Sequence, residues 1–316
     1  MLKKYRIYIV LIFTGFLVFY FKYIDYRDTE KSQFHIDNIS LLDKIFLADR
    51  AGNKIILEKK EDHWVVNHQF IVREDAINTL LLTANRIRVK RPVPRASLEN
   101  VIKYMATTGV LVEFFIKDKI VKSYTIGSNT SDHLANYMLL KGEEKPQIVH
   151  IPSFNGFLSP KYGIQANILD INNWRSNTIF DLSFEDIYQI RYTDYLNKNN
   201  SYYLRATTPF QLFNSKNQPV SFRNQKILVL LNSFNKLNGE SFKKEKDNLI
   251  LKEPLQELIV NNDTLKTYSI SNLDYKSKND NFNIERKYAR VNNGELMLIQ
   301  DYVFNKVLIN INELTE

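Results

Sequence analysis

The hexapeptide SYTIGS at residues 123–128 has a counterpart far downstream, TYSISN at residues 267–272, and both run hydroxyl, tyrosine, hydroxyl, isoleucine. Each belongs to a pair of β-branched and aromatic runs joined by a tight turn, at residues 110–128 and at residues 255–271. Runs of this kind predict β-hairpins. Their recurrence raises the question of whether the chain contains one module twice.

The elements around the two hairpins recur in the same order. Residues 43–67 have the short strand runs of a β-meander, and residues 182–206 repeat them. ISLLDKIFL (39–47) is similar to LSFEDIYQI (182–190), with Ile187 opposite Ile45 at an offset of 142, and aligning the hairpins sets Tyr268 opposite Tyr124. This order predicts the internal duplication of a module of roughly 140 residues. A chance likeness between hairpins rich in tyrosine and isoleucine is the alternative.

Helical spacing of apolar residues predicts two helices in the first half and one in the second. The first helix lies within residues 73–89 and is broken by Pro92 and Pro94; the second is capped by Ser97 and stops at Gly109. In the second half, residues 222–239 repeat the first helix up to Gly239, and the charged, loop-like SFKKEKDN (241–248) follows. The predicted buried residues are Ile77, Leu80, Leu81, Ala84 and Ile87, then Leu98, Val101, Ile102 and Met105, then Ile227, Leu230, Leu231 and Phe234.

The sequence therefore predicts an α+β chain, in which a single N-terminal transmembrane helix precedes two β-rich modules of antiparallel sheet with one or two helices each. The expected boundaries are a signal anchor at 1–24, a tether at 25–40, the first module at 41–160, a connector at 161–180, the second module at 181–310 and a tail at 311–316.

The N-terminal anchor is predicted from residues 7–21, which carry no charge and are rich in Ile, Leu, Val and Phe. The run is followed by bulky aromatic residues rather than by the small residues of a cleavage site, so we expect it to stay attached. Cations precede the run, which favours a cytoplasmic N-terminus, with the bulk of the chain in the periplasm of the inner membrane. The residues expected at the membrane interface are Lys3, Lys4, Arg6, Tyr20, Lys22 and Tyr23.

Charge and composition exclude several classes of protein. The formal net charge is +8, and four of these charges are the anchor's own Lys3, Lys4, Arg6 and Lys22. The remaining +4 is too small for a nucleic-acid-binding domain, so no nucleic-acid partner is expected. The chain contains no cysteine, which excludes disulfides and thiolate metal sites.

The search for catalytic residues finds none. His63 and His68 are five residues apart, which matches neither the period of a strand nor a helical turn, so joint metal binding is not expected. There is no Gly-x-Ser-x-Gly nucleophile motif and no phosphate-binding glycine loop. We therefore expect a protein that is not an enzyme, with no catalytic residues, no metal and no cofactor.

The most distinctive polar stretch is RIRVKRPVPRAS at residues 86–97. It is expected to join the end of one helix to the next through a proline-stiffened linker. One interpretation is a patch that grips an anionic partner such as a lipid headgroup, a cell-wall polymer or an acidic protein face. The other is only the favourable placement of cations at a helix C-terminus. The candidate residues are Arg86, Arg88, Lys90, Arg91 and Arg95.

The stretches at residues 43–67, 76–94 and 137–158 resemble a family from Bacteroidota. Its members are membrane-anchored periplasmic proteins that carry the "forty-three-forty" domain of unknown function, and similar modules are appended to components of gliding-associated ABC-type transport systems. The resemblance implies a periplasmic, β-rich module without known enzymatic activity.

Together these features predict a scaffold or accessory subunit of a cell-envelope assembly concerned with secretion, outer-membrane biogenesis, transport or gliding. Its expected partners are membrane or periplasmic proteins, and the N-terminal helix holds it in the membrane. The alternative is an anchored protein that binds or hydrolyses cell-wall or surface glycans. The many aromatic residues and the scattered carboxylates suggest this alternative.

Overall fold

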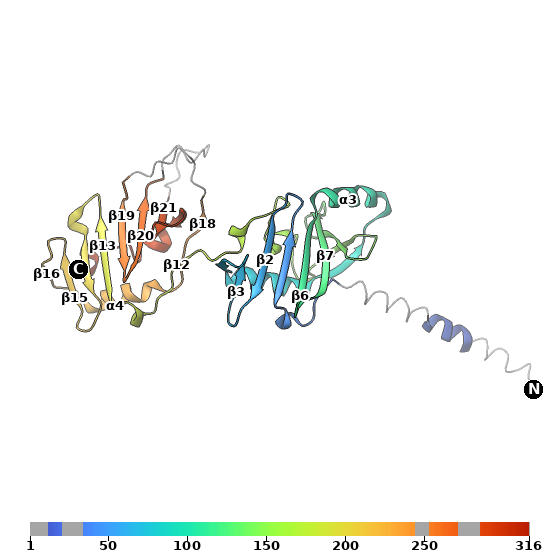
Figure 1. The fold of residues 1–316 in the computed structure, drawn as a ribbon, viewed down its shortest axis with the longest axis horizontal. Coiled ribbons are helices and arrows are strands. Elements are labelled where there is room, and N and C mark those ends of the chain that lie inside the picture. Colours follow the sequence, from blue (N-terminus) through green and yellow to red (C-terminus); the bar gives the residue numbers. More distant parts are fainter. Residues whose placement is uncertain (1–11, 21–33, 244–252, 271–284, 316) are drawn as a thin grey trace, which may run out of the picture. The chain divides into compact units, whose positions relative to one another are not determined.

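The computed structural model describes residues 12–20, 34–243, 253–270 and 285–315 (Figure 1). The chain divides into two compact units, Met1–Ser176 and Asn177–Glu316. A nine-stranded, wholly antiparallel sheet dominates each unit, and few helices accompany it. The prediction of two β-rich modules with antiparallel sheets is confirmed at this level.

The first sheet pairs its strands in the order β4-β3-β2-β1-β6-β7-β8-β9-β5. Alternation of apolar and polar residues forms these strands: in β1, Ile45 and Leu47 are fully buried while their neighbours are partly exposed. The strands are β1 (Lys44–Ala48), β2 (Lys54–Lys59), β3 (Trp64–Val66), β4 (Phe70–Ile71), β5 (Arg88–Pro92), β6 (Val110–Ile116), β7 (Lys119–Asn129), β8 (Asn136–Leu140) and β9 (Gln147–His150).

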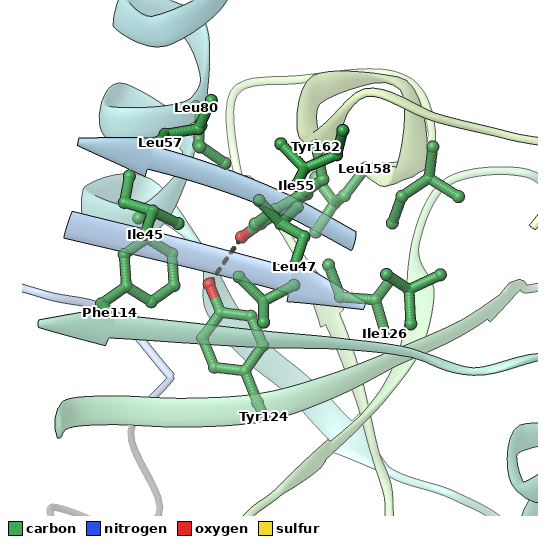
Figure 2. Close-up of a cluster of buried hydrophobic side chains, with 14 of the residues drawn as sticks. Ile45, Leu47, Ile55, Leu57, Leu80, Phe114, Tyr124, Ile126, Leu158 and Tyr162 are labelled. Carbon is green, nitrogen blue, oxygen red and sulfur yellow. Dashed lines mark hydrogen bonds between the residues drawn. The ribbon is translucent and has the colours of Figure 1, made fainter. Parts of the chain in front are cut away.

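Both helices predicted for the first unit are present. Helix α2 (Glu74–Arg86) buries Ile77 and Leu80 in the main core, and Figure 2 shows Leu80 beside Ile45 and Leu57 of the sheet. Helix α3 (Arg95–Thr108) ends before Gly109 as predicted. Its predicted start was wrong, because Pro94 occupies the cap position and the Ser97 hydroxyl lies inside the first turn, where it donates to the Pro94 carbonyl at 3.1 Å.

The two helices contact separate apolar clusters. Residues of α2 belong to the main core with Tyr124, Ile126 and Met138, whereas Met105 of α3 belongs to a smaller cluster with Ile148. Neighbouring residues on one strand, Ile148 and Val149 of β9, are divided between these clusters. Since successive side chains of a strand point to opposite faces, α2 and α3 cover opposite faces of the sheet.

The residues after β9 belong to the first core. They form the short elements η2 (Ser159–Tyr162), β10 (Ile164–Gln165), β11 (Ile168–Leu169) and η3 (Ile171–Asn173). Tyr162 and Trp174 are buried in that core, and the Tyr162 and Tyr124 hydroxyls form a hydrogen bond of 2.8 Å (Figure 2). Residues 161–176 were expected to form a connector, but they pack as part of the first unit.

The second sheet pairs its strands in the order β16-β15-β14-β13-β19-β20-β21-β22-β18. Helix α4 (Asn224–Leu231) follows β16 as α2 follows β4, and it buries Ile227, Leu230 and Leu231 as predicted. The strands are β13 (Gln189–Asp194), β14 (Tyr202–Arg205), β15 (Gln211–Asn214), β16 (Pro219–Val220), β18 (Ser241–Phe242), β19 (Gln256–Val260), β20 (Asp263–Tyr268), β21 (Arg286–Val291) and β22 (Met297–Gln300).

Several short elements complete the second unit. The predicted helix does not reach Gly239, because a 3-10 turn, η6 (Asn232–Phe234), and strand β17 (Leu237–Asn238) come first. Strand β17 pairs with β12 (Thr178–Phe180). Helices α5 (Asp301–Phe304) and α6 (Ile311–Thr315) follow the last strand, so residues expected to form a tail are helical and bury Ile311 and Leu314.

The residue alignment predicted between the halves was wrong in two places. Ile45 lies in β1, where it pairs with Leu57 and Phe114, whereas Ile190, not Ile187, makes the matching pairs with Leu204 and Val260. Ile187 lies three residues before Ile190, directly after a 3-10 turn, η4 (Phe184–Asp186).

The two tyrosines that the alignment set opposite each other also differ in place. Tyr124 lies in the main core of its unit, whereas Tyr268 belongs to a second cluster with Ile270, Tyr288 and Leu298, outside the main core. Two features cause the difference: the first hairpin contains a register shift at Phe114/Phe115, and the second hairpin is shorter.

Candidate functional site

The basic segment at residues 86–95 forms a sheet edge rather than a linker. Arg86 is the last residue of α2, Arg88 to Pro92 form β5, and Arg95 is the first residue of α3. Strand β5 pairs with β9 on one side and with no other described strand. All five candidate cations are exposed. We call Arg86, Arg88, Lys90, Arg91 and Arg95 the basic edge.

Few acidic groups balance the basic edge. Lys90 Nζ lies 3.9 Å from Asp132 Oδ2, and Arg88 Nη1 donates to the carbonyl oxygens of Asn85 at 2.7 Å and Ile87 at 2.8 Å. Among the described residues, Arg86, Arg91 and Arg95 have no ion-pair partner within 4.0 Å. Their charges are therefore open to an outside anion.

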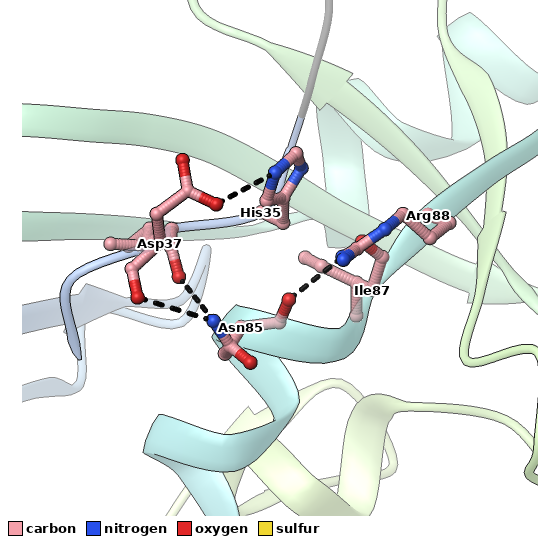
Figure 3. Close-up of polar contacts among 6 residues, drawn as sticks. His35, Asp37, Asn85, Ile87 and Arg88 are labelled. Atoms are coloured by element: carbon pink, nitrogen blue, oxygen red, sulfur yellow. Dashed lines mark hydrogen bonds and ion pairs between the residues drawn. The ribbon is translucent and has the colours of Figure 1, made fainter.

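The N-terminal end of the globular part docks beside the basic edge (Figure 3). Phe34 and Ile36 are buried, and the Ile36 N–H donates to the Ala84 carbonyl at 2.9 Å. The Asn85 amide donates to the carbonyl oxygens of Ile36 at 2.9 Å and Asp37 at 3.3 Å. The last residues of the expected tether are thus fixed to the C-terminal end of α2, three residues before Arg88. We call residues 34–37 the tether root.

Burial and positive charge act together on the titratable groups here. The pKa of His35 is lowered by burial and by the charge of Arg88, although Asp37, 3.2 Å from His35 Nε2, opposes the shift. Burial also lowers the pKa of Lys122, and that of His150 is lowered by burial and by Lys90. Both histidines are therefore neutral at pH 7 and add no charge to the basic edge.

A row of aromatic side chains crosses the outer face of the second sheet. Arg191, Tyr203 and Phe213 occupy paired positions on β13, β14 and β15. The Tyr203 and Phe213 rings stack with centroids 5.9 Å apart, and the Arg191 guanidinium carbon lies 5.1 Å from the Tyr203 centroid. A hollow of about 440 Å³ borders this row and is also lined by polar side chains, Thr193, Lys198, Ser201, Asn214, Ser215 and Asn217.

Two smaller hollows lie elsewhere. One of about 350 Å³ is lined by Leu182, Phe184 and Leu228 of the second unit, together with Glu185. Another of about 250 Å³ in the first unit is bordered by Asp75 and by Trp174, whose buried indole nitrogen has no hydrogen-bond partner among the described residues. None of the three hollows is lined by two carboxylates.

The histidines are dispersed. His63 Nδ1 lies 2.7 Å from Asp62 Oδ1, and His68 Nδ1 lies 2.8 Å from Glu58 Oε2, so each has its own carboxylate neighbour. Within the described ranges, no group of three or more His, Asp or Glu side chains is placed to hold a metal ion.

The anchor prediction falls mostly outside the described residues, including Lys3, Lys4, Arg6, Lys22 and Tyr23. Residues 12–20 are helical, and their apolar side chains are exposed, with Phe16 at 67% and Phe19 at 68%. Tyr20 is the last described residue of this stretch. In the part of the chain that the structure describes, no helix combines the length and hydropathy that a membrane span needs.

Comparison of the chain with protein-family models, with curated proteins and with solved structures gives no match. The resemblance to the Bacteroidota envelope family stays a prediction.

Proposed function

We propose that this chain is a membrane-anchored scaffold or accessory subunit of a cell-envelope assembly, built from one duplicated β-rich module. The observation that carries the proposal is the identical pairing order of the two nine-stranded sheets. In each, the strands before the first helix form one side of the sheet and the strands after it form the other. A long antiparallel order has many alternatives, so its recurrence supports duplication over a chance likeness between hairpins.

The second support is the difference between the surfaces of the two modules. On the outer face of the first sheet, Lys44, Glu58 and His68 form an ionic cluster. The second sheet has the row of Arg191, Tyr203 and Phe213. Two copies with one fold and different surfaces can hold two different partners, as a scaffold requires.

Exposed apolar side chains mark the surfaces that would meet protein partners. Val229 on α4 is 61% exposed and Tyr302 on α5 is 87% exposed, while both helices bury other residues in the core. Aromatic and large aliphatic residues of this kind are enriched in protein interfaces.

The proposed location is the inner membrane, with a single N-terminal helix as the anchor, the N-terminus in the cytoplasm and both modules in the periplasm. The exposed phenylalanines of residues 12–20 support an apolar environment for this helix, because contact between such a large apolar surface and water is unfavourable.

Site-specific photocrosslinking of the full chain in native membranes tests the scaffold role. A crosslinking residue in place of Val229 or Tyr302 should form an adduct with a defined envelope protein in near-stoichiometric amount. The same residue in place of the exposed Lys54 of the first unit serves as the control and should give no such adduct. The proposal would be contradicted if the chain forms no adduct from any of these positions and is also a free monomer after extraction in mild detergent.

The row of Arg191, Tyr203 and Phe213 favours a second candidate, binding of a cell-wall or surface glycan without hydrolysis. Sugars contact aromatic rings through their apolar faces and bind amide and hydroxyl groups at their edges. The hollow beside Tyr203 offers both kinds of group. If this candidate is right, Tyr203→Ala should abolish sedimentation of the full chain with purified cell walls. Phe46→Ala, on β1 of the first unit, should leave it unchanged. Equal sedimentation of all three proteins would exclude it.

A further inference from the structure

We propose that the basic edge lies against the anionic headgroups of the membrane that holds the chain. This inference rests on the proposed membrane anchor. It adds a second contact, made by a folded surface of the first unit, and it names the chemistry of the partner: phosphate groups of lipids.

The charge of the basic edge favours anionic headgroups. Between residues 86 and 95 the chain has five cations and no acidic residue. The rest of residues 34–176 has 14 basic and 15 acidic side chains. The positive charge of the folded part of the first unit therefore comes from this one segment. Clusters of four to eight Lys and Arg beside the cytoplasmic end of a membrane helix bind anionic lipids, and the same attraction of opposite charges acts at any leaflet that carries anionic headgroups.

The basic edge lies beside the segment that leads to the proposed anchor. The tether root is held by Ala84 and Asn85, and Arg86 follows immediately in the chain. Only residues 21–33 separate the apolar helix of residues 12–20 from Phe34. A fully extended chain of this length spans at most roughly 45 Å. The tether root, and the basic edge with it, therefore stays close to a membrane that contains the helix.

The backbone of β5 favours a lipid surface over a strand of a partner protein. An open sheet edge could accept a strand of a partner protein, but β5 carries three features that oppose this. Pro92 has no N–H to donate, the ladder shifts register between Val89 and Arg91, and Arg or Lys occupies three of its five positions. Lipid headgroups bind the exposed cations without a regular ladder of backbone hydrogen bonds, so these three features do not oppose their binding.

The absence of native cysteine allows a direct test with single labels on the full chain. Val89→Cys places a fluorophore on the basic edge, and Ile71→Cys places one on β4, the opposite edge strand of the same sheet. Both native residues are exposed, Val89 at 38% and Ile71 at 58%. The chain is reconstituted in vesicles of phosphatidylcholine, with or without phosphatidylglycerol, that contain an acceptor dye on the headgroups.

The expected result is higher energy transfer from position 89 in the phosphatidylglycerol vesicles than in neutral vesicles. High salt should remove the increase because it screens exposed charges. Position 71 should show no dependence on lipid charge. Replacing all five residues of the basic edge by Gln should abolish the increase. A matched control, which replaces the exposed Lys54, Lys59, Lys60, Lys117 and Lys119 by Gln, should retain it.

Equal transfer from position 89 in neutral and anionic vesicles would overturn the inference, as would an increase that survives the five Gln replacements at the basic edge. The anchor is tested separately by flotation with neutral vesicles in high salt. If the chain fails to float there, the anchor is wrong. If the chain floats but energy transfer from position 89 does not depend on lipid charge, the anchor stands and only the role of the basic edge is excluded.

Discussion

At the scale of single residues, the first core contains a polar pair in an apolar setting. Tyr124 and Tyr162 are both fully buried, and their hydroxyls meet at 2.8 Å. Burial raises the pKa of both, so each stays neutral throughout the physiological range. Each hydroxyl gives the other a partner in a region that excludes water, and the pair joins β7 to η2.

Tyr162→Phe should lower the free energy of unfolding by about 1–3 kcal/mol, because it leaves the Tyr124 hydroxyl buried without a partner. The double variant, with Tyr124→Phe added, should recover most of that loss. Denaturant titration of the three proteins measures the coupling. Tyr202→Phe in the second unit is the control. The Tyr202 hydroxyl is buried without a partner among the described residues, so its loss should cost little. Additive losses at 124 and 162 would contradict the pairing.

Stability should depend on pH through His35 and His150. Their pKa values lie below 6.5 in the folded chain, so the unfolded chain binds the proton more readily. Their contribution is fully present above pH 6.5, decreases as the pH falls through 6.5 towards the lowered values, and then levels off. Urea titrations at a series of pH values should show this decrease, and it should be smaller in a His35→Asn, His150→Asn variant. An identical decrease in both proteins would exclude the histidines as its cause.

At the scale of elements, sequence reasoning succeeds where burial is periodic and local. Helix α2 repeats its apolar positions over three turns, and the hairpin strands β6 and β7 are long enough for their composition to decide the fold. These features come from neighbours in the sequence, so they can be predicted without tertiary contacts.

Strand β5 could not be predicted in the same way. All five of its residues are exposed and one is proline, so the local pattern resembles a linker. It is a strand only because β9, more than fifty residues later, lies beside it. The alignment of the halves failed for a related reason: which isoleucine enters the ladder, Ile187 or Ile190, is set by pairing with distant strands, and composition does not reveal it. The basic edge was identified as a cluster of charges, but its position beside the tether root depends on long-range contacts of Asn85.

Helix α2 offers a direct measure of its core packing. Leu80 is fully buried and Leu82 is 45% exposed on the same helix. Leu80→Ala should lower the free energy of unfolding by about 2–5 kcal/mol, because it removes methyl groups from a close-packed site and leaves a cavity. Leu82→Ala should change it by about 0.5 kcal/mol or less. Equal losses for the two variants would show that α2 does not pack as described.

At the scale of the whole molecule, the chain has two units whose nine-stranded sheets pair their strands in the same order. Each unit has its own main core, and within the described residues these two clusters share no member. Each unit also has its own helices, α2 and α3 in the first unit and α4, α5 and α6 in the second. The units therefore meet the physical requirement for separate folding domains.

Calorimetry of the full chain in detergent should show two unfolding transitions. Leu80→Ala should lower the midpoint of one transition, and Leu230→Ala, in the core of the second unit, should lower the midpoint of the other. The expected independence follows because the two main cores share no described residue, and substitutions without shared partners have additive effects. A single transition that both substitutions shift equally would show that the two units fold as one.

We propose that the two β-rich modules stay attached to the membrane by the chain's own N-terminus. The most direct test is intact-mass measurement of the chain from native membranes, after a carbonate wash that removes peripheral proteins. The account predicts a membrane-bound product of the full 37.3 kDa chain. A product that lacks roughly the first two dozen residues and is recovered in the soluble fraction would contradict it.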